Sequence, residues 1–339
     1  MQAEGLRAAG TEVRLACQRG AWKFFMRTGL PVKRVSRRSA QSLCRSGHVV
    51  VDHGAELAGA DLVFVHNLFS AANQYLEDAV PEQRITGEAA FFRQLRPATT
   101  IVANSQLIRD ALVRQHGLNP QRIVVHYPGF ESQRFAASRA ARLRRKARAA
   151  LELGAAVPLV GFITSGDMHK RGLDLFLTAA ERIAAQSPGV RFLVVGARHL
   201  PEWAVRHPLF VSQTALYRPK NKQPELWLAA LDVFLYAARF EEFGMVVAEA
   251  QALGIPVLTS RRVGAAECLP ATYQPWLTDR PDGAEFAAKT LALLADEPTR
   301  RQLGLAGIAN IAAYDRQHYV DAAVATILDT ASSANPAGR

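Results

Sequence analysis

The sequence predicts an α/β protein with two Rossmann-like domains, each containing a parallel sheet between layers of helices. The chain has 339 residues, which is about the length of two domains. Short, continuous apolar runs, typical of strands buried on both faces, alternate with stretches of helical periodicity. A Pro128–Gly129 pair interrupts the apolar run at 122–135, and such a break is expected where the chain leaves a domain.

These patterns divide the chain into four segments. Residues 1–130 form the first domain, and residues 131–156 form a linker with a basic helix. Residues 157–313 form the second domain, and residues 314–339 form a C-terminal helix with a frayed tail.

The composition favours a cytoplasmic globular protein. Hydrophobic residues make up 49% of the chain and charged residues 21%, which is ordinary for a soluble protein. No apolar run approaches the roughly 18–20 residues of a membrane span, and the N-terminal stretch lacks the apolar core of a secretory signal. Cys17, Cys44 and Cys268 are scattered without the spacing of a metal or redox motif, so we expect reduced thiols.

The positive charge is concentrated in the first half of the chain. Residues 1–150 carry 23 Lys and Arg against 11 Asp and Glu, whereas residues 151–339 carry 18 against 19. A basic face favours nucleic acid, an anionic membrane surface or a phosphorylated acceptor as partner. No nucleic-acid-binding motif accompanies the charge, so we do not expect nucleic acid.

The start of the first domain departs from the usual pattern. Residues 1–10 resemble the latter part of a helix, and residues 11–17 resemble the strand after it. A domain of this class normally begins with a strand and a glycine-rich turn that lead into that helix. We therefore expect the first domain to lack its usual first strand, because either the start codon lies upstream or the strand has been lost.

Aromatic and cationic residues are interleaved near residue 25. Aromatic rings at headgroup level, beside cations on lipid phosphates, suit a membrane interface. The alternative is a short helix with one core face and solvated arginines. The candidates for the membrane-facing side chains are Trp22, Lys23, Phe25 and Arg27.

Two predicted strands of the first domain each end in a histidine. His53 follows the apolar run at 48–52, and His66 with Asn67 follows the run at 60–65. Side chains at the carboxyl ends of parallel strands point into the crevice where such sheets bind ligands. A histidine at a strand end is also often structural, but the matching positions favour His66 as a site residue, with Asn67 and His53 as acceptor-side candidates.

Two basic stretches flank the start of the second domain. The helix at 137–153 is strongly basic and is either a solvated face or a patch for anionic lipid. The loop after the strand at 157–165 carries Gly166 and the adjacent cations Lys170 and Arg171. Cations at this end of a strand suit the neutralisation of a diphosphate leaving group, and solvated loop charges are the alternative.

Residues 231–267 read as strand, polar turn, helix, strand and turn. Glu241 lies on the turn, and Glu249 lies about one helical turn into an otherwise apolar helix. Backbone N–H groups at the start of this helix form an anion site that suits a phosphate, and a carboxylate one turn deeper suits the paired hydroxyls of a ribose. An amphipathic surface helix is the alternative. The predicted N–H donors are those of Phe243, Gly244, Met245 and Val246.

Together these stretches resemble the retaining nucleotide-sugar glycosyltransferases of family 4, which have the two-domain GT-B fold. The segment from Glu241 to Glu249 is similar to the E-x7-E motif of that family. The following VGAAE is similar to its G-G-x-x-E loop, with Ala265 in place of the second glycine. The stretches at 101–112, 122–135 and 159–177 resemble the end of the first domain, the strand into the linker and the phosphate-binding loop.

The resemblance implies two domains that face each other across a cleft, and transfer of a sugar from a nucleoside diphosphate with retained anomeric configuration. It implies that Glu249 binds the ribose and that Glu241 binds the hydroxyls of the donor sugar. The helix N-terminus, with Lys170 and Arg171, would hold the diphosphate, and His66 would face the acceptor or the donor sugar. The family usually has Lys-Gly with an arginine several residues earlier, whereas this chain has Lys-Arg-Gly. An alternative assignment therefore exchanges the roles of Lys170 and Arg171. Neither a metal nor another cofactor is implied.

The basic first half leads us to expect a glycan or glycolipid acceptor at the inner membrane surface, with lipopolysaccharide core ahead of lipid-linked oligosaccharide and exopolysaccharide. The expected location is the cytoplasm, with peripheral attachment to the inner membrane as an open alternative. Two rival functions remain. One is a nucleotide-sugar epimerase of the same architecture, and the other is a non-catalytic protein that binds a nucleotide sugar.

Overall fold

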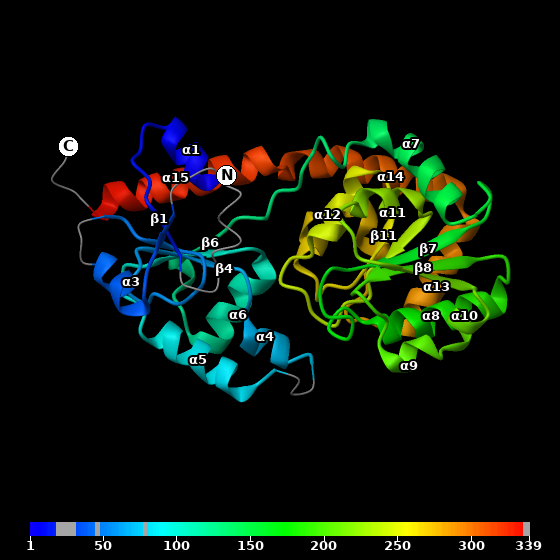
Figure 1. Ribbon diagram of the computed structural model, residues 1–339, viewed down its shortest axis with the longest axis horizontal. Coiled ribbons are helices and arrows are strands. Elements are labelled where there is room, and N and C mark those ends of the chain that lie inside the picture. The colour runs from blue at the N-terminus through cyan, green and yellow to red at the C-terminus, as the bar shows by residue number, and fades with distance from the viewer. Residues whose placement is uncertain (18–31, 45–47, 77–79, 335–339) are drawn as a thin grey trace. The chain divides into compact units, whose positions relative to one another are not determined.

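The computed structural model describes residues 1–17, 32–44, 48–76 and 80–334, and contacts between its residues divide the chain into two compact units. The N-terminal unit comprises residues 1–74, 78–127 and 317–339, and the C-terminal unit comprises residues 75–77 and 128–316. Both units are α/β, and every strand pair within them is parallel. The predicted fold class is therefore confirmed for each unit (Figure 1).

The N-terminal unit contains a four-stranded sheet in the order β3-β4-β5-β6 and a separate pair, β1 with β2. All four residues of the central strand β4 are buried, which explains its continuous apolar sequence. The elements are α1 (Gln2–Ala8), β1 (Leu15–Cys17), β2 (Val32–Arg34), α3 (Arg37–Leu43), β3 (Val51–Asp52), β4 (Leu62–Val65), α4 (Phe69–Asn73), α5 (Glu82–Arg93), β5 (Thr100–Ala103), α6 (Gln106–His116), the 3-10 turn Pro120–Arg122, β6 (Ile123–Val125) and α15 (Arg316–Ala334).

Both ends of the described chain contribute to the core of the N-terminal unit. Ala323 and Ile327 of α15 are buried in one cluster with Leu6 of α1 and Leu62 and Phe64 of β4. His126, after β6, also hydrogen-bonds the Thr326 hydroxyl through Nε2 at 2.8 Å. Helix α15 follows the C-terminal unit in sequence but belongs to the N-terminal unit by its contacts.

The C-terminal unit contains a five-stranded sheet in the order β11-β10-β7-β8-β9. Helices α7, α11 and α12 lie on one face of the sheet, and α8 and α13 lie on the other (Figure 1). The elements are α7 (Ala137–Ala150), β7 (Leu159–Ile163), α8 (Leu173–Gln186), β8 (Arg191–Gly196), α9 (Glu202–Val205), α10 (Pro208–Val211), β9 (Ala215–Pro219), α11 (Pro224–Ala230), β10 (Val233–Leu235), α12 (Met245–Ala252), β11 (Val257–Leu258), the 3-10 turns Gly264–Cys268, Ala271–Trp276 and Ala312–Tyr314, α13 (Gly283–Ala295) and α14 (Glu297–Ile311).

In the part of the chain that the structure describes, no helix combines the length and the apolar character needed to cross a membrane.

The basic helix α7 directs part of its charge into the protein. Arg148 is 3% exposed, and its guanidinium donates to the backbone oxygens of Ala230, Gly154 and Val157 at 3.1, 2.7 and 2.8 Å. It also pairs with the Asp232 carboxylate at 2.8 Å. Of the two sequence interpretations for this helix, a solvated face and a lipid patch, neither holds for Arg148, because its guanidinium links the helix to the chain just before β7 and β10.

We expect Arg148→Ala to destabilise the protein by about 3 kcal/mol, because it leaves several carbonyl oxygens and one oxygen of the half-buried Asp232 carboxylate without this donor. Arg145→Ala, on the exposed side of the same helix, is the matched control and should change stability by less than about 0.5 kcal/mol. Urea denaturation of both variants measures the difference. Equal stabilities would show that the Arg148 network contributes nothing beyond surface charge.

Candidate functional site

The loop before α8 lies directly against the turn after β10. Gly172, at the N-cap of α8, has a φ of +75°, and a Cβ added there would lie 2.0 Å from the Ala237 backbone oxygen. Only glycine permits this approach. Arg239 then donates its backbone N–H to the Lys170 oxygen at 3.0 Å. The two segments that the sequence marked as donor-binding are therefore joined through their backbones.

Two ion pairs link these segments through their side chains. The Nε of Arg171 lies 2.6 Å from Oε2 of Glu241, and the Tyr236 hydroxyl donates to the same oxygen at 2.8 Å. The Nζ of Lys170 donates to both carboxylate oxygens of Glu242 at 2.9 and 2.8 Å. Each cation of the Lys-Arg pair thus meets one carboxylate of the Glu-Glu pair.

Burial shifts the proton affinities of this cluster. Glu241 is 8% exposed, and desolvation raises its pKa above the ordinary value although Arg171 opposes the shift. Desolvation also raises the pKa of Tyr236 well above its usual range, so the phenol stays protonated and donates to Glu241. An incoming anion would therefore compete with Glu241 and Glu242 for the two cations.

The polar turn predicted between β10 and α12 is corrected by the structure. Phe240, Glu241, Glu242 and Phe243 are all 8% exposed or less. The charged side chains are buried because each has an opposite charge within reach, and this partner was not visible in the local sequence. Glu242 and Tyr236 were not predicted from the sequence. The Glu-Glu doublet opposite a Lys-Arg doublet was the signal that could have identified Glu242.

Helix α12 begins where the sequence placed its anion site. Gly244 is its N-cap with a φ of +95°, and no side chain caps the helix. Met245 and Val246 occupy the first two helical positions, and Phe243, on the other side of Gly244, is buried. The backbone donors at this end are thus suited to an anion. Gly166 lies on the other segment, where an added Cβ would be 3.3 Å from Nε of Arg171.

Glu249 lies in the second turn of α12 and is largely removed from solvent. Desolvation raises its pKa from 4.5 to about 7; the nearby Arg134 lowers the pKa, while Glu225 and Glu131 raise it further. Arg134, the cation that lowers this pKa, is already engaged, since it pairs with Glu225 at 2.7 Å. Glu249 is therefore a carboxyl group poised between its two protonation states near neutral pH, as is common at binding sites.

His53 and His66 of the N-terminal unit lie together. Nδ1 of His53 is 3.2 Å from Nε2 of His66, and the His53 ring stacks on Phe64 with 4.4 Å between centroids. Desolvation and repulsion from His66 lower the pKa of His53 to about 4, and desolvation lowers the pKa of His66. Both rings are thus neutral at pH 7. Their nitrogens are suited to exchanging hydrogen bonds with hydroxyl groups.

The two histidines and Asn67 line one cavity of about 290 Å³ in the N-terminal unit. The cavity also contains residues that the sequence analysis missed. Arg84 lies over the Phe69 ring at 5.0 Å, and Glu88 accepts the backbone N–H groups of Phe69 and Ser70 at the start of α4. Aromatic faces beside polar groups are suited to a sugar or a similar polyol. Arg84 and Glu88 carry no local motif, and only the packing of α5 places them here.

The remaining candidates are not tested by this geometry. Trp22, Lys23, Phe25 and Arg27 lie outside the described residues. The interpretation of this stretch as membrane-facing stays a prediction.

Residues 158–296 match the family model described as Glycosyl transferases group 1. In sequence, the chain is 30% identical to the D-inositol 3-phosphate glycosyltransferase of Segniliparus rotundus over an alignment of 274 residues, and the match covers 77% of this chain and 59% of the relative. The enzyme of the same name from Streptomyces bingchenggensis is 30% identical over 242 residues, covering 66% of this chain and 50% of that relative. The chain thus spans less than two thirds of the length of these relatives.

The structure is similar to that of WaaG, a glycosyltransferase involved in lipopolysaccharide biosynthesis. The TM-score is 0.74 at 17% identity, and the match covers 96% of this chain and 94% of WaaG. It is also similar to HepE of Anabaena in complex with UDP and glucose, with a TM-score of 0.69 at 16% identity and coverage of 97% and 94%. These likenesses confirm the GT-B fold. That the two domains face each other across a cleft stays a prediction.

Glu249 gives a prediction about stability. Because its pKa rises from 4.5 to about 7 on folding, the folded protein loses stability as pH increases across that interval. Glu249→Gln should therefore be more stable than the parent protein at pH 8, by about 1–3 kcal/mol, and no more stable at pH 4. Thermal denaturation at both pH values measures this. The exposed Glu202→Gln is the control, and a pH-independent effect at Glu249 would contradict the assignment.

Proposed function

We propose that this protein is a retaining glycosyltransferase that moves a hexose from a nucleoside-diphosphate sugar to an envelope glycan. One observation carries the proposal. Lys170 and Arg171, Glu241 and the N-terminus of α12 lie together within the stretch matched by the glycosyltransferase family model, with Glu249 one turn deeper in the helix. HepE, a structural relative, is recorded in complex with UDP-glucose, which supports a nucleotide sugar as donor.

The diphosphate would bind where α12 begins. Its negative charge suits the N-terminal N–H groups of Met245 and Val246, and it would draw Lys170 and Arg171 away from Glu242 and Glu241. The same cations then stabilise the charge that grows on the departing diphosphate, which is the largest contribution in most transfers of this kind. No metal is required by this scheme.

The donor sugar and ribose would meet the two motif carboxylates. Released from Arg171, Glu241 would accept hydrogen bonds from the sugar hydroxyls, while Tyr236 keeps the carboxylate oriented. Glu249 would accept hydrogen bonds from the ribose hydroxyls. Because its pKa is about 7, the free protein contains both forms at neutral pH, and these hydrogen bonds would favour the ionised form. The departing diphosphate would act as the base toward the incoming hydroxyl, so no second catalytic carboxylate is needed.

The acceptor would occupy the cavity of the N-terminal unit. The rings of Phe69 and Phe91 offer faces for a sugar ring, and the neutral His66 and Asn67 offer hydrogen bonds to hydroxyls. We favour a lipopolysaccharide-core acceptor over a lipid-linked oligosaccharide, since WaaG acts in lipopolysaccharide biosynthesis. We also propose a cytoplasmic location with peripheral attachment to an anionic membrane, based on the excess of 23 basic over 11 acidic residues in positions 1–150.

The central test is Glu241→Ala. Because the variant removes the carboxylate that orients the donor sugar, we expect turnover to fall at least about 100-fold. UDP release from UDP-glucose, in the presence of lipopolysaccharide core, measures the loss, and a panel of other nucleotide sugars identifies the donor. The exposed Glu202→Gln is the control and should retain activity.

Three outcomes would contradict the proposal. Unchanged turnover in Glu241→Ala would remove Glu241 from the mechanism. A changed sugar without an extended acceptor would indicate an epimerase. Binding of nucleotide sugars without turnover on any acceptor would indicate a non-catalytic binding protein.

A separate variant tests the acceptor cavity. His66→Ala removes a hydrogen-bonding ring from the cavity, so kcat/KM for the acceptor should fall about 10- to 100-fold, with KM for the donor within about twofold of the parent value. The exposed His48→Ala is the matched control. If the donor KM rises instead, His66 belongs to donor binding rather than to the acceptor site.

A further inference from the structure

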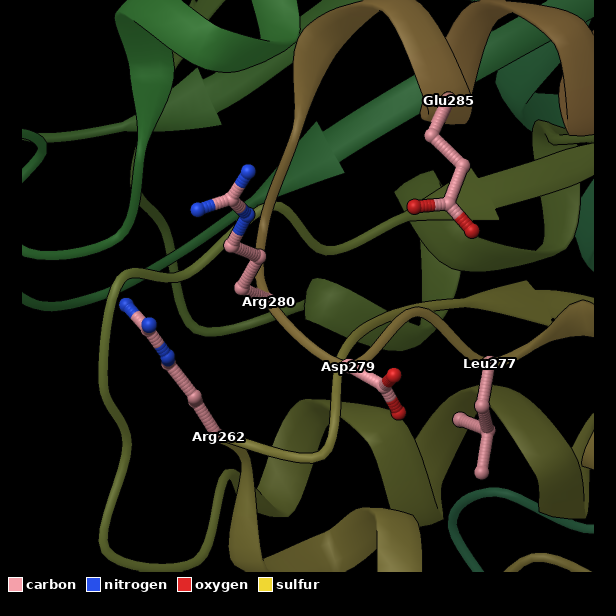
Figure 2. Close-up of a pocket in the computed structure, with 5 residues that line it drawn as sticks. All are labelled: Arg262, Leu277, Asp279, Arg280 and Glu285. Atoms are coloured by element: carbon pink, nitrogen blue, oxygen red, sulfur yellow. The ribbon is translucent and has the colours of Figure 1, made fainter.

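A second cavity, of about 400 Å³, lies in the C-terminal unit between the loop after β11 and the loop before α13 (Figure 2). Arg262 comes from the first loop, and Leu277, Asp279 and Arg280 come from the second. Glu285 on the first turn of α13 completes the lining. Neither arginine belongs to a motif that the sequence analysis identified.

The charges of this cavity are unequally compensated. Both carboxylates already have cations, since Asp279 pairs with Arg261 at 3.2 Å and Glu285 pairs with Lys289 at 3.2 Å. Within the described part of the chain, neither Arg262 nor Arg280 has a carboxylate oxygen within ion-pair distance. Figure 2 shows both guanidinium groups extending to the same side, away from the two carboxylates. The Arg262 guanidinium carbon lies 4.4 Å from the centroid of the Tyr75 ring, and stacking on a ring face leaves the N–H groups at the edge of the guanidinium for an acceptor. Both arginines therefore keep a positive charge that a ligand can neutralise.

The two loops are held together before any ligand binds. Arg261 donates its backbone N–H to the Thr278 oxygen at 2.8 Å, and Thr278 donates to the Thr259 oxygen at 3.1 Å. Ser260 and Thr278 form an isolated parallel bridge, and both side chains are at most 1% exposed. The backbones that carry Arg262 and Arg280 are thus fixed relative to each other, which reduces the entropy lost on binding.

The same loop supports the proposed donor site. The Arg262 oxygen accepts the Glu241 N–H at 3.0 Å, and the Glu241 oxygen accepts the Gly264 N–H at 3.0 Å. A ligand on Arg262 would therefore sit on the loop that positions Glu241.

We propose that Arg262 and Arg280 form a binding site for a phosphoryl group, separate from the site of the donor diphosphate. A phosphoryl group carries close to two negative charges and three acceptor oxygens, which match two guanidinium groups, whereas one carboxylate is satisfied by a single arginine. The cavity also has room for the ring or chain to which the phosphoryl group is attached. As a binding site it is independent of the proposed function, and its use by a substrate of the transferase rests on that function.

The test is a binding titration of the whole protein with inorganic phosphate, glucose 6-phosphate and unphosphorylated glucose. We expect saturable binding of the phosphorylated probes, weakened at least about 10-fold by Arg280→Gln and by Arg262→Gln. Arg301→Gln, which changes an exposed arginine of α14, is the matched control and should bind as the parent does. Since Arg280 is exposed, its variant should fold normally, and thermal denaturation checks this.

The two sources of a phosphoryl group give different results. Tighter binding of glucose 6-phosphate than of inorganic phosphate assigns the site to a phosphate ester, and equal binding assigns it to free phosphate. Absence of saturation below about 10 mM, or equal affinity in the Arg280, Arg262 and Arg301 variants, overturns the proposal. Because the readout is binding, it is unaffected if glycosyl transfer itself fails, and UDP binding to Arg280→Gln shows that the donor site is intact.

Discussion

The close contact between the Lys170–Gly172 loop and the turn after β10 is the constraint on which the candidate donor site depends. It exists because Gly172 has no side chain, so the Ala237 oxygen can approach its Cα. Arg171 and Glu241 are then within 2.6 Å, and Lys170 and Glu242 form a second pair. A larger residue at position 172 would separate the segments and break both ion pairs, which is costly in a buried setting.

The site combines binding capacity with a cost in stability. Burial raises the pKa of Glu249 to about 7 and raises that of Glu241, so ionising these carboxyl groups costs more free energy in the folded protein than in water. Other charges of the same unit have many more partners. Arg148, for example, is buried but donates to three backbone oxygens and to Asp232.

The N-terminal unit illustrates a different dependence, on the whole length of the chain. Its core takes α15 from the C-terminal end and α1 from the beginning, and both pack against β4 and β5. The ends of β3 and β4 then bring His53 within 3.2 Å of His66, and α5 adds Arg84 and Glu88 to the same cavity. Changes in α15 are therefore expected to affect this cavity, although the two are distant in sequence.

The sequence by itself determined the α/β class, the two domains and the start of α12, because each rests on local signals. These signals are the continuous apolar runs of buried strands, the helical stretch that follows Gly244, and the glycines and prolines at which elements end. It also predicted Lys170, Arg171, Glu241 and Glu249 as candidate site residues, since the carboxyl ends of parallel strands meet at one edge of a sheet. Only the tertiary structure decided which charges pair. Glu242, Tyr236, Arg84 and the Arg262–Arg280 cavity depend on segments far apart in the chain, and no local pattern encodes such a contact.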